Sequence, residues 1–114
     1  LPFDRRPQPG AFPTQPAFTQ INLDGTRRGV RPHGPRRAPG IVVAVLDTGV
    51  DPTHPLLAGR LNPGFNALDP TRPPVERLDG AHNRAYGHGT MIADLIAHIA
   101  PDARILPVRV LDAD

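Results

Sequence analysis

The chain has 114 residues, a formal net charge of +2 and 16 prolines, and it contains neither Cys nor Ser. This length is enough for one domain at most, and the missing residue types exclude a disulfide, a thiol or serine nucleophile and a Cys-bound metal among these residues. There is no initiator Met, signal-peptide core or apolar run long enough to span a bilayer. We therefore expect part of a longer protein, with no membrane partner.

Residues 1–40 are rich in Arg and Pro, and their basic excess accounts for the high isoelectric point. Frequent prolines without hydrophobic periodicity predict an extended segment or linker, in which residues 21–30 could form a short strand and turn. An Arg-rich arm could bind an anionic partner. No aromatic residues alternate with the arginines for base stacking, so the pattern favours a solvated linker over a nucleic-acid partner.

The segment VVAVLDTGVD, residues 42–51, begins the part of the chain that we expect to fold, residues 41–114. Its β-branched apolar run predicts a strand buried on both faces, as in a parallel sheet. The Pro-broken residues after it allow only a short helical turn at Leu56–Gly59. RLNPGFN, residues 60–66, could be a short strand, and residues 68–86 read as a long surface loop.

A helix is predicted over residues 89–100, in GHGTMIADLIAHIAP, and RILPVRVLD predicts a second apolar strand from residue 104. The apolar residues of the helix recur on one face, and Pro101 ends it; they are Met91, Ile92, Leu95, Ile96 and Ile99. Strands alternating with a helix indicate an α/β fold with a parallel sheet. In such sheets the ends of strands and the starts of helices share one edge, which predicts that Asp47 and His88 meet there.

Two protease chemistries could use Asp47. In a dimeric aspartic protease, the Asp-Thr-Gly carboxylate faces a second Asp and shares a proton with it. In the other chemistry, the carboxylate holds the Nδ1 side of a histidine that activates a serine. The helix and the GHGT segment have no place in an all-β aspartic protease subunit, whereas His88 within GHGT fits the second chemistry.

VVAVLDTGVDPTHPLL and GHGTMIADLIAHIAPDARILPVRVLD together resemble the Asp and His boxes of the subtilisin-like (subtilase) serine protease family, over residues 41–114. The resemblance implies the amino-terminal part of the peptidase domain, a partial and incomplete parallel-sheet α/β fold. It implies that Asp47 and His88 are the triad aspartate and histidine. It also implies a set of supporting motif residues, which are Thr48, Gly49, Gly87, Gly89 and Thr90.

The family's serine box, oxyanion residue and cleft-forming segments would follow Asp114. We therefore expect the amino-terminal portion of a serine endopeptidase that is inactive alone. The complete enzyme would have a peptide or protein substrate as its partner. A second polypeptide that completes the domain could be another partner. The alternative is a non-enzymatic truncated fragment or pseudoenzyme with an anion-binding arm. A secreted location is suggested by the resemblance alone.

Some positions depart from the family pattern. Leu56 stands where the family often has an acidic calcium ligand, and the helix runs into APDARI without the loop that completes that site, so we expect no metal and no cofactor. Asp94 stands where the family usually has Gly. We expect Asp94 and His98, four residues apart, to form a surface pair, and His54 to be structural in its Pro-rich turn. His33 and His82 receive no role.

Overall fold

The structure is a computed structural model that describes residues 16–25 and 40–114. The chain divides into two units, residues 1–37 and 38–114. In the first unit, helix α1 spans Pro16–Gln20 and residues 23–25 are also helical, so the expectations of extended chain and of a strand at these residues are wrong. Pro at the first helical position is favoured because its φ is preset and it has no N–H to satisfy. The rest of the predicted linker lies outside the described residues.

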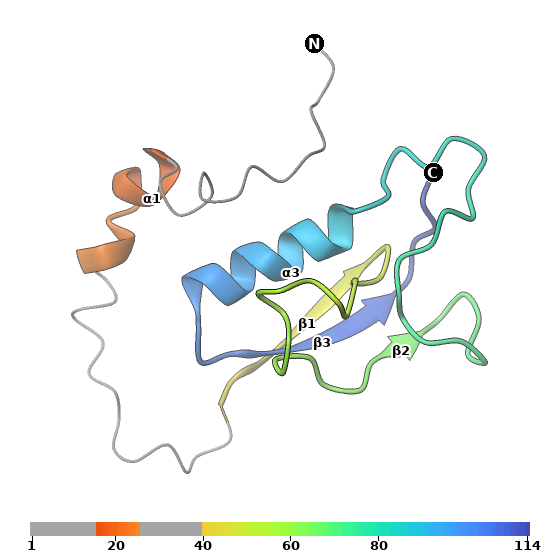
Figure 1. Ribbon diagram of the computed structural model, residues 1–114, viewed down its shortest axis with the longest axis horizontal. Helices are drawn as coiled ribbons and strands as arrows, with labels where there is room; N and C mark the ends of the chain where they lie inside the picture. Colours follow the sequence, from red (N-terminus) through yellow and green to blue (C-terminus); the bar gives the residue numbers. More distant parts are fainter. Residues whose placement is uncertain (1–15, 26–39) are drawn as a thin grey trace. The chain divides into compact units, whose positions relative to one another are not determined.

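Three parallel strands form the sheet of the second unit (Figure 1). They are β1 (Val42–Asp47), β2 (Phe65–Asn66) and β3 (Arg104–Arg109), in the order β1-β3-β2. Arg109 is in register with Asp47 on one side and with Asn66 on the other. The carboxyl ends of all three strands therefore lie level at one edge of the sheet, and the α/β class with a partial parallel sheet is confirmed.

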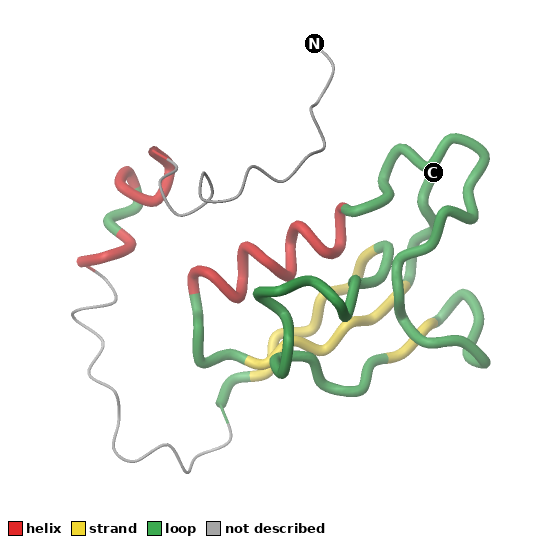
Figure 2. Tube along the Cα trace, viewed as in Figure 1, coloured by secondary structure: helices red, strands yellow, loops and turns green. Residues whose placement is uncertain are grey.

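Helix α3 (His88–Ile99) packs against β1 and β3, as Figure 2 shows for the helix above the strands. Its buried residues are Gly89, Ala93 and Ala97, whereas Met91 and Ile99 are exposed. The predicted apolar face is therefore only partly correct, because small side chains at every fourth position let the helix approach the sheet closely. The core cluster includes residues of the helix itself, and it consists of Val45, Val50, Leu57, Ala93, Ala97 and Ile105, with Leu61, Ile92 and Ile96 packed against it.

The connections between these elements are irregular. Residues 51–60 form successive turns, in which the N–H groups of His54, Leu57 and Arg60 each bond to the carbonyl three residues earlier. The sequence predicts a short turn of helix at Leu56–Gly59, and the structure has consecutive hydrogen-bonded turns there instead. Residues 67–87 form the predicted long loop between β2 and α3.

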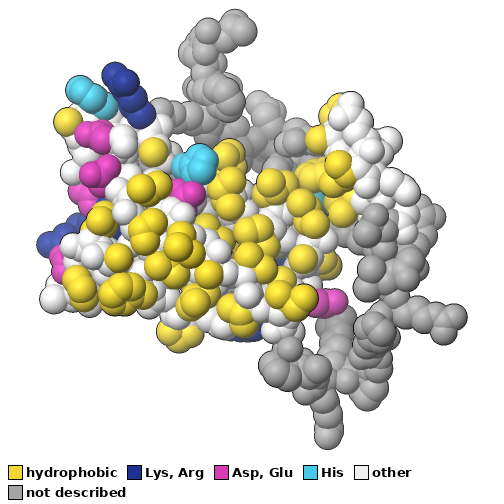
Figure 3. All heavy atoms as spheres, turned by 180° about the vertical axis from the view of Figure 1, so that it is seen from behind, with side chains coloured by type: hydrophobic (Ala, Val, Ile, Leu, Met, Phe, Trp, Pro, Cys, Tyr) yellow, Lys and Arg dark blue, Asp and Glu magenta, His cyan; other side chains and the backbone are white. Residues whose placement is uncertain are grey.

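The face of the sheet that points away from α3 is apolar and open among the described residues. Along β1, Val42 and Leu46 are 48% and 61% exposed, whereas Val45 between them is 5% exposed. Phe65 of β2 is also exposed. Figure 3 shows hydrophobic side chains gathered over much of the molecule seen from behind.

Candidate active site

Asp47 is the last residue of β1, and its carboxylate is held in one direction. Its Oδ1 accepts a 2.7 Å hydrogen bond from the backbone N–H of Thr48. Its backbone carbonyl accepts bonds from the N–H groups of Val110 and Leu111, so the strand end is also tied to the chain beyond β3. The side chain is only 11% exposed, which removes most of the water that would compete for the carboxylate.

His88 is the first residue of α3, and its ring lies against Asp47. Its Nδ1 atom is 2.9 Å from each of the two carboxylate oxygens of Asp47. A carboxylate accepts hydrogen bonds, so this contact favours the tautomer that carries the proton on Nδ1. The His88 side chain is 51% exposed, and Nε2 is left as the ring nitrogen that can accept a proton. The predicted meeting of Asp47 and His88 at one sheet edge is thus found in the structure.

The glycines on either side of His88 are needed for different reasons. Gly87 caps the helix with φ 91°, a left-handed conformation that side chains rarely adopt, although a Cβ there would meet nothing within 4 Å. A Cβ on Gly89 would lie 2.1 Å from the carbonyl oxygen of Gly49 and 3.2 Å from Cβ of Asp47. Gly89 therefore permits the close approach between the start of α3 and the end of β1.

The two threonines of the motifs meet at one carboxylate, that of Glu76 in the long loop. Thr48 Oγ1 donates to Glu76 Oε1 at 2.9 Å, and Thr90 Oγ1 donates to Glu76 Oε2 at 2.7 Å. The backbone N–H of Thr90 also donates to Oε1, at 3.2 Å. Sequence reasoning missed Glu76. It is the only Glu of the chain, which is a weak signal because it belongs to no motif.

Asp51 follows the Asp-Thr-Gly motif and connects it to α3. Its N–H donates to Thr90 Oγ1 at 2.8 Å. Its Oδ1 accepts bonds from the hydroxyl and the N–H of Thr53, and these hydrogen bonds lower the pKa of Asp51 below its ordinary value of 3.8. The carboxylate of Asp51 thus stays ionised while its backbone helps to fix Thr90.

Asp94 and His54 form a separate contact away from the Asp47–His88 pair. His54 Nδ1 lies 3.6 Å from Asp94 Oδ1, with side chains 28% and 14% exposed. The expected surface position of Asp94 is therefore wrong, because its carboxylate faces inward to the turns that follow β1. No group of three or more His, Asp or Glu residues that could hold a metal ion occurs within residues 16–25 and 40–114.

No helix in the described part of the chain has both the length and the apolarity needed to cross a membrane.

Comparison with known proteins gives a consistent result for the second unit. The model of the subtilase family matches residues 38–114. Fervidolysin of Fervidobacterium pennivorans is 39% identical over 84 residues, which are 63% of this chain and 11% of that protein. Thermitase of Thermoactinomyces vulgaris is 37% identical over 83 residues, 64% of this chain and 27% of that protein.

Furin of Homo sapiens is 36% identical over 87 residues, 66% of this chain and 11% of furin. The chain therefore spans about a tenth to a quarter of the length of these relatives. No solved structure matches it significantly.

Proposed function

Because the chain belongs to the subtilase family, we propose that it supplies the aspartate and the histidine of the catalytic triad of a serine endopeptidase. The observation that carries this proposal is the contact of His88 Nδ1 with both carboxylate oxygens of Asp47, at 2.9 Å. The contact of Asp47 with His88 supports this chemistry over the aspartic-protease alternative, in which the histidine has no part.

In the proposed mechanism His88 transfers protons and Asp47 does not. His88 Nε2 takes the proton of a serine hydroxyl as the serine oxygen attacks the peptide carbonyl carbon. The imidazolium then gives this proton to the leaving amine as the C–N bond breaks and an acyl-enzyme remains. Water then attacks the acyl-enzyme. His88 takes a proton from this water and gives it to the serine oxygen as the acid product leaves. Asp47 remains ionised, holds the ring and stabilises the imidazolium at each step.

The serine must come from outside these residues, because the chain contains none. We therefore propose that the 114 residues alone hydrolyse no peptide, since loss of the serine costs on the order of a million-fold in turnover. The substrate of the complete enzyme would be a peptide or protein. One relative, from Paenibacillus polymyxa, is by its name an intracellular serine protease, so the family is not confined to secreted proteins.

The first test is the DNA that follows the codon for Asp114. An open reading frame with the family's serine box supports the proposal, and the full-length gene product should then release a labelled peptide and be blocked by a serine-directed phosphonate. In that protein Asp47→Asn and His88→Ala should each lower turnover by at least about a thousand-fold. Turnover that survives both substitutions would contradict the assigned roles, and a stop codon would favour the non-enzymatic alternative.

The apolar face of the sheet supports a second part of the proposal, that further polypeptide completes the domain. Val42, Leu46 and Phe65 expose large side chains on this face, and β1 is an edge strand of the described sheet. Exposed apolar edges promote association with other chains. We expect the 114 residues alone to self-associate or to be partly unfolded. A monodisperse monomer by sedimentation, with strongly protected amides in β1 and β3, would contradict this.

A further inference from the structure

We propose that Glu76 is a positioning residue that joins the Asp-Thr-Gly motif to the start of α3 and thereby holds His88 against Asp47. The inference rests on the proposed function, because it gives Glu76 a part in the same site. Glu76 touches neither Asp47 nor His88 in the hydrogen bonds of the structure, so it acts through the threonines of the two motifs.

The direction of the hydrogen bonds from Thr48 and Thr90 explains why position 76 needs a carboxylate. Thr48 Oγ1 gives its proton to Glu76 and accepts the N–H of Gly89 at 3.1 Å. Thr90 Oγ1 likewise gives its proton to Glu76 and accepts the N–H of Asp51. An ionised carboxylate only accepts hydrogen bonds. It therefore orients both hydroxyl protons toward itself and leaves both hydroxyl oxygens free to accept.

These two hydroxyls make reciprocal connections between the motifs. Thr48, which follows Asp47, binds the N–H of Gly89, which follows His88. Thr90 on α3 binds the N–H of Asp51, which follows the Asp-Thr-Gly motif. Glu76 binds both threonines at once. One side chain thus fixes the spacing between the strand end that carries Asp47 and the helix start that carries His88.

The backbone around Glu76 is itself fixed to the site. A Cβ on Gly49 would lie 2.8 Å from the backbone N of Glu76, so the loop packs directly on the Asp-Thr-Gly motif. The N–H of Val50 donates to the carbonyl of Pro74 at 3.0 Å. These two backbone contacts fix the position of Glu76, so its carboxylate is held next to the Asp-Thr-Gly motif.

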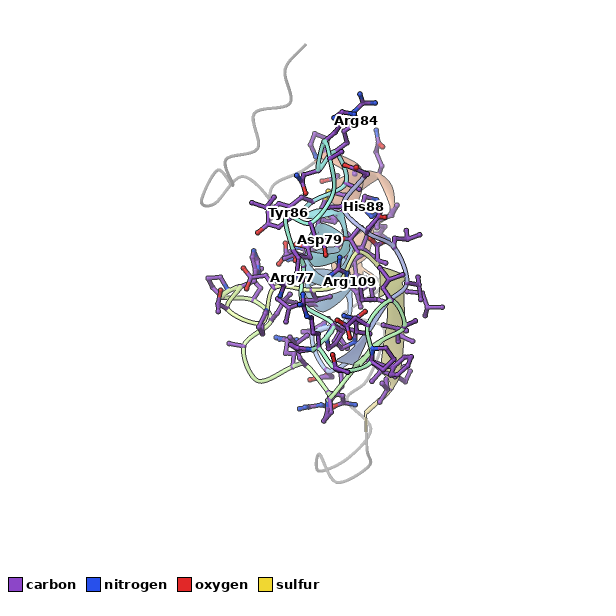
Figure 4. All side chains as sticks on the ribbon, turned by 90° about the vertical axis from the view of Figure 1, so that its right-hand side faces the viewer. Arg77, Asp79, Arg84, Tyr86, His88 and Arg109 are labelled. Atoms are coloured by element: carbon purple, nitrogen blue, oxygen red, sulfur yellow. The ribbon has the colours of Figure 1, made fainter. Side chains whose placement is uncertain are left out.

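A buried arginine anchors the same loop to the sheet. Arg109, the last residue of β3, is 2% exposed. Its Nη2 atom donates hydrogen bonds to both carboxylate oxygens of Asp79, at 2.8 and 2.7 Å. Figure 4 shows Arg109, Asp79 and Arg77 beside one another. Arg109 is in register with Asp47 of β1, so the loop is fastened to the same sheet edge as the candidate site.

The test compares Glu76→Ala and Glu76→Gln in the full-length gene product, with the histidine ring nitrogens labelled for NMR. The signal of the His88 Nδ1 proton reports the bond to Asp47 and does not require a serine. We expect Glu76→Ala to broaden or abolish this signal. Glu76→Gln should weaken it less, because its amide oxygen still accepts from Thr48 but its NH₂ group faces the hydroxyl of Thr90 as a donor.

Two further variants separate positioning from a general loss of stability. Asp69→Asn removes another acid of the same loop, one whose carboxylate bonds to Thr71 and not to either motif, and it should leave the signal unchanged. Thr48→Val removes one of the two hydroxyls and should reproduce the effect of Glu76→Ala. If Glu76→Ala does not fold, Glu76→Gln and Thr48→Val still decide the question.

If the full-length gene product is active, the same variants can also be compared by steady-state kinetics. Misplacement of His88 by a fraction of an ångström should lower kcat of Glu76→Ala on the order of 10- to 100-fold with KM nearly unchanged. A His88 signal and a kcat like those of Asp69→Asn would overturn the inference. Absence of all turnover in the unmodified protein, together with a His88 signal that still depends on Glu76, would instead contradict the proposed function alone.

Discussion

The ring of His54 and the carboxylate of Asp94 face one another at 3.6 Å, and neither His54 Nδ1 nor Asp94 Oδ1 has a hydrogen-bond partner in the structure. The contact joins the turns after β1 to the middle of α3. It is an ion pair only when the imidazole is protonated. Because both atoms are buried, loss of either side chain leaves the other without the polar group that faces it, so the two residues should be energetically coupled.

We predict that a double-mutant cycle of His54→Ala and Asp94→Ala gives a coupling free energy of about 0.5–1.5 kcal/mol. Urea unfolding of the full-length gene product measures this value. His82→Ala, in the long loop, serves as the control and should show no coupling to Asp94. A coupling free energy of zero would mean that the two side chains contribute to stability independently of one another.

The bond between Arg109 and Asp79 should contribute more to stability than the neighbouring bond between Arg77 and Asp79. The Arg109 side chain is 3% exposed, so Asp79→Ala leaves a guanidinium without its carboxylate away from water. We expect a loss of about 1–3 kcal/mol in the free energy of unfolding, measured with urea. Arg77→Ala is the matched control, because its Nε lies 3.9 Å from Asp79 with both side chains well exposed. Its effect should stay below about 0.5 kcal/mol.

Both variants leave the core cluster intact, so their difference reports the two ion pairs. Arg109 also donates hydrogen bonds to the carbonyls of Leu111 and Val75, at 3.4 and 3.5 Å. Equal losses for Asp79→Ala and Arg77→Ala would show that these two bonds are enough to satisfy the buried arginine.

The pairing of Asp47 with His88 could be predicted because each residue lies at the end of an element with a clear periodic signal. The apolar run of residues 42–46 indicates a strand, and the helix follows His88. In a parallel α/β fold these two ends must share an edge. Glu76 could not be predicted in this way, since its place depends on a loop path set by distant contacts such as that of Val50 with Pro74.

The buried face of α3 was only partly predictable for a related reason. Periodicity weighs large apolar residues most, and it selected Met91 and Ile99, which are 51% and 39% exposed. The helix side chains that are buried in the core are instead Ala93 and Ala97, whose small size carries little signal in a hydrophobic pattern. The inward orientation of Asp94 toward His54 was missed because it joins two segments far apart in the sequence.

Acid should weaken the segment that follows the Asp-Thr-Gly motif. The pKa of Asp51 is lowered chiefly by the hydroxyl of Thr53 and then by the Thr53 N–H. A lowered pKa in the folded state means that the bonds stabilise the fold above the ordinary value of 3.8 and that this contribution is lost as the pH falls through the folded value. Thr53→Val should therefore raise the pKa of Asp51, as followed by NMR of its carboxyl carbon.

The same substitution should lower the free energy of unfolding near neutral pH, and its effect should shrink as the pH falls through the folded-state pKa of Asp51, below which the carboxyl is protonated in both states. Thr53→Ser keeps the hydroxyl and is the control. A loss of stability from Thr53→Val that does not change as the pH is lowered would show that the methyl and hydroxyl of Thr53 act by packing, independently of Asp51.

The two glycines beside His88 should respond differently to alanine. Gly87→Ala meets open space but must adopt φ 91°, which costs about 1–3 kcal/mol while the Asp47–His88 contact is kept. Gly59, with φ 72° and open space, is the matched control at a distance from the site, and Gly59→Ala should cost a similar amount. Gly89→Ala would drive its Cβ to 2.1 Å from the carbonyl oxygen of Gly49, so the start of α3 must move away from β1. We therefore expect the His88 Nδ1 proton signal to survive Gly87→Ala and to disappear in Gly89→Ala, and a signal that survives both would show that the helix start can shift without separating the pair.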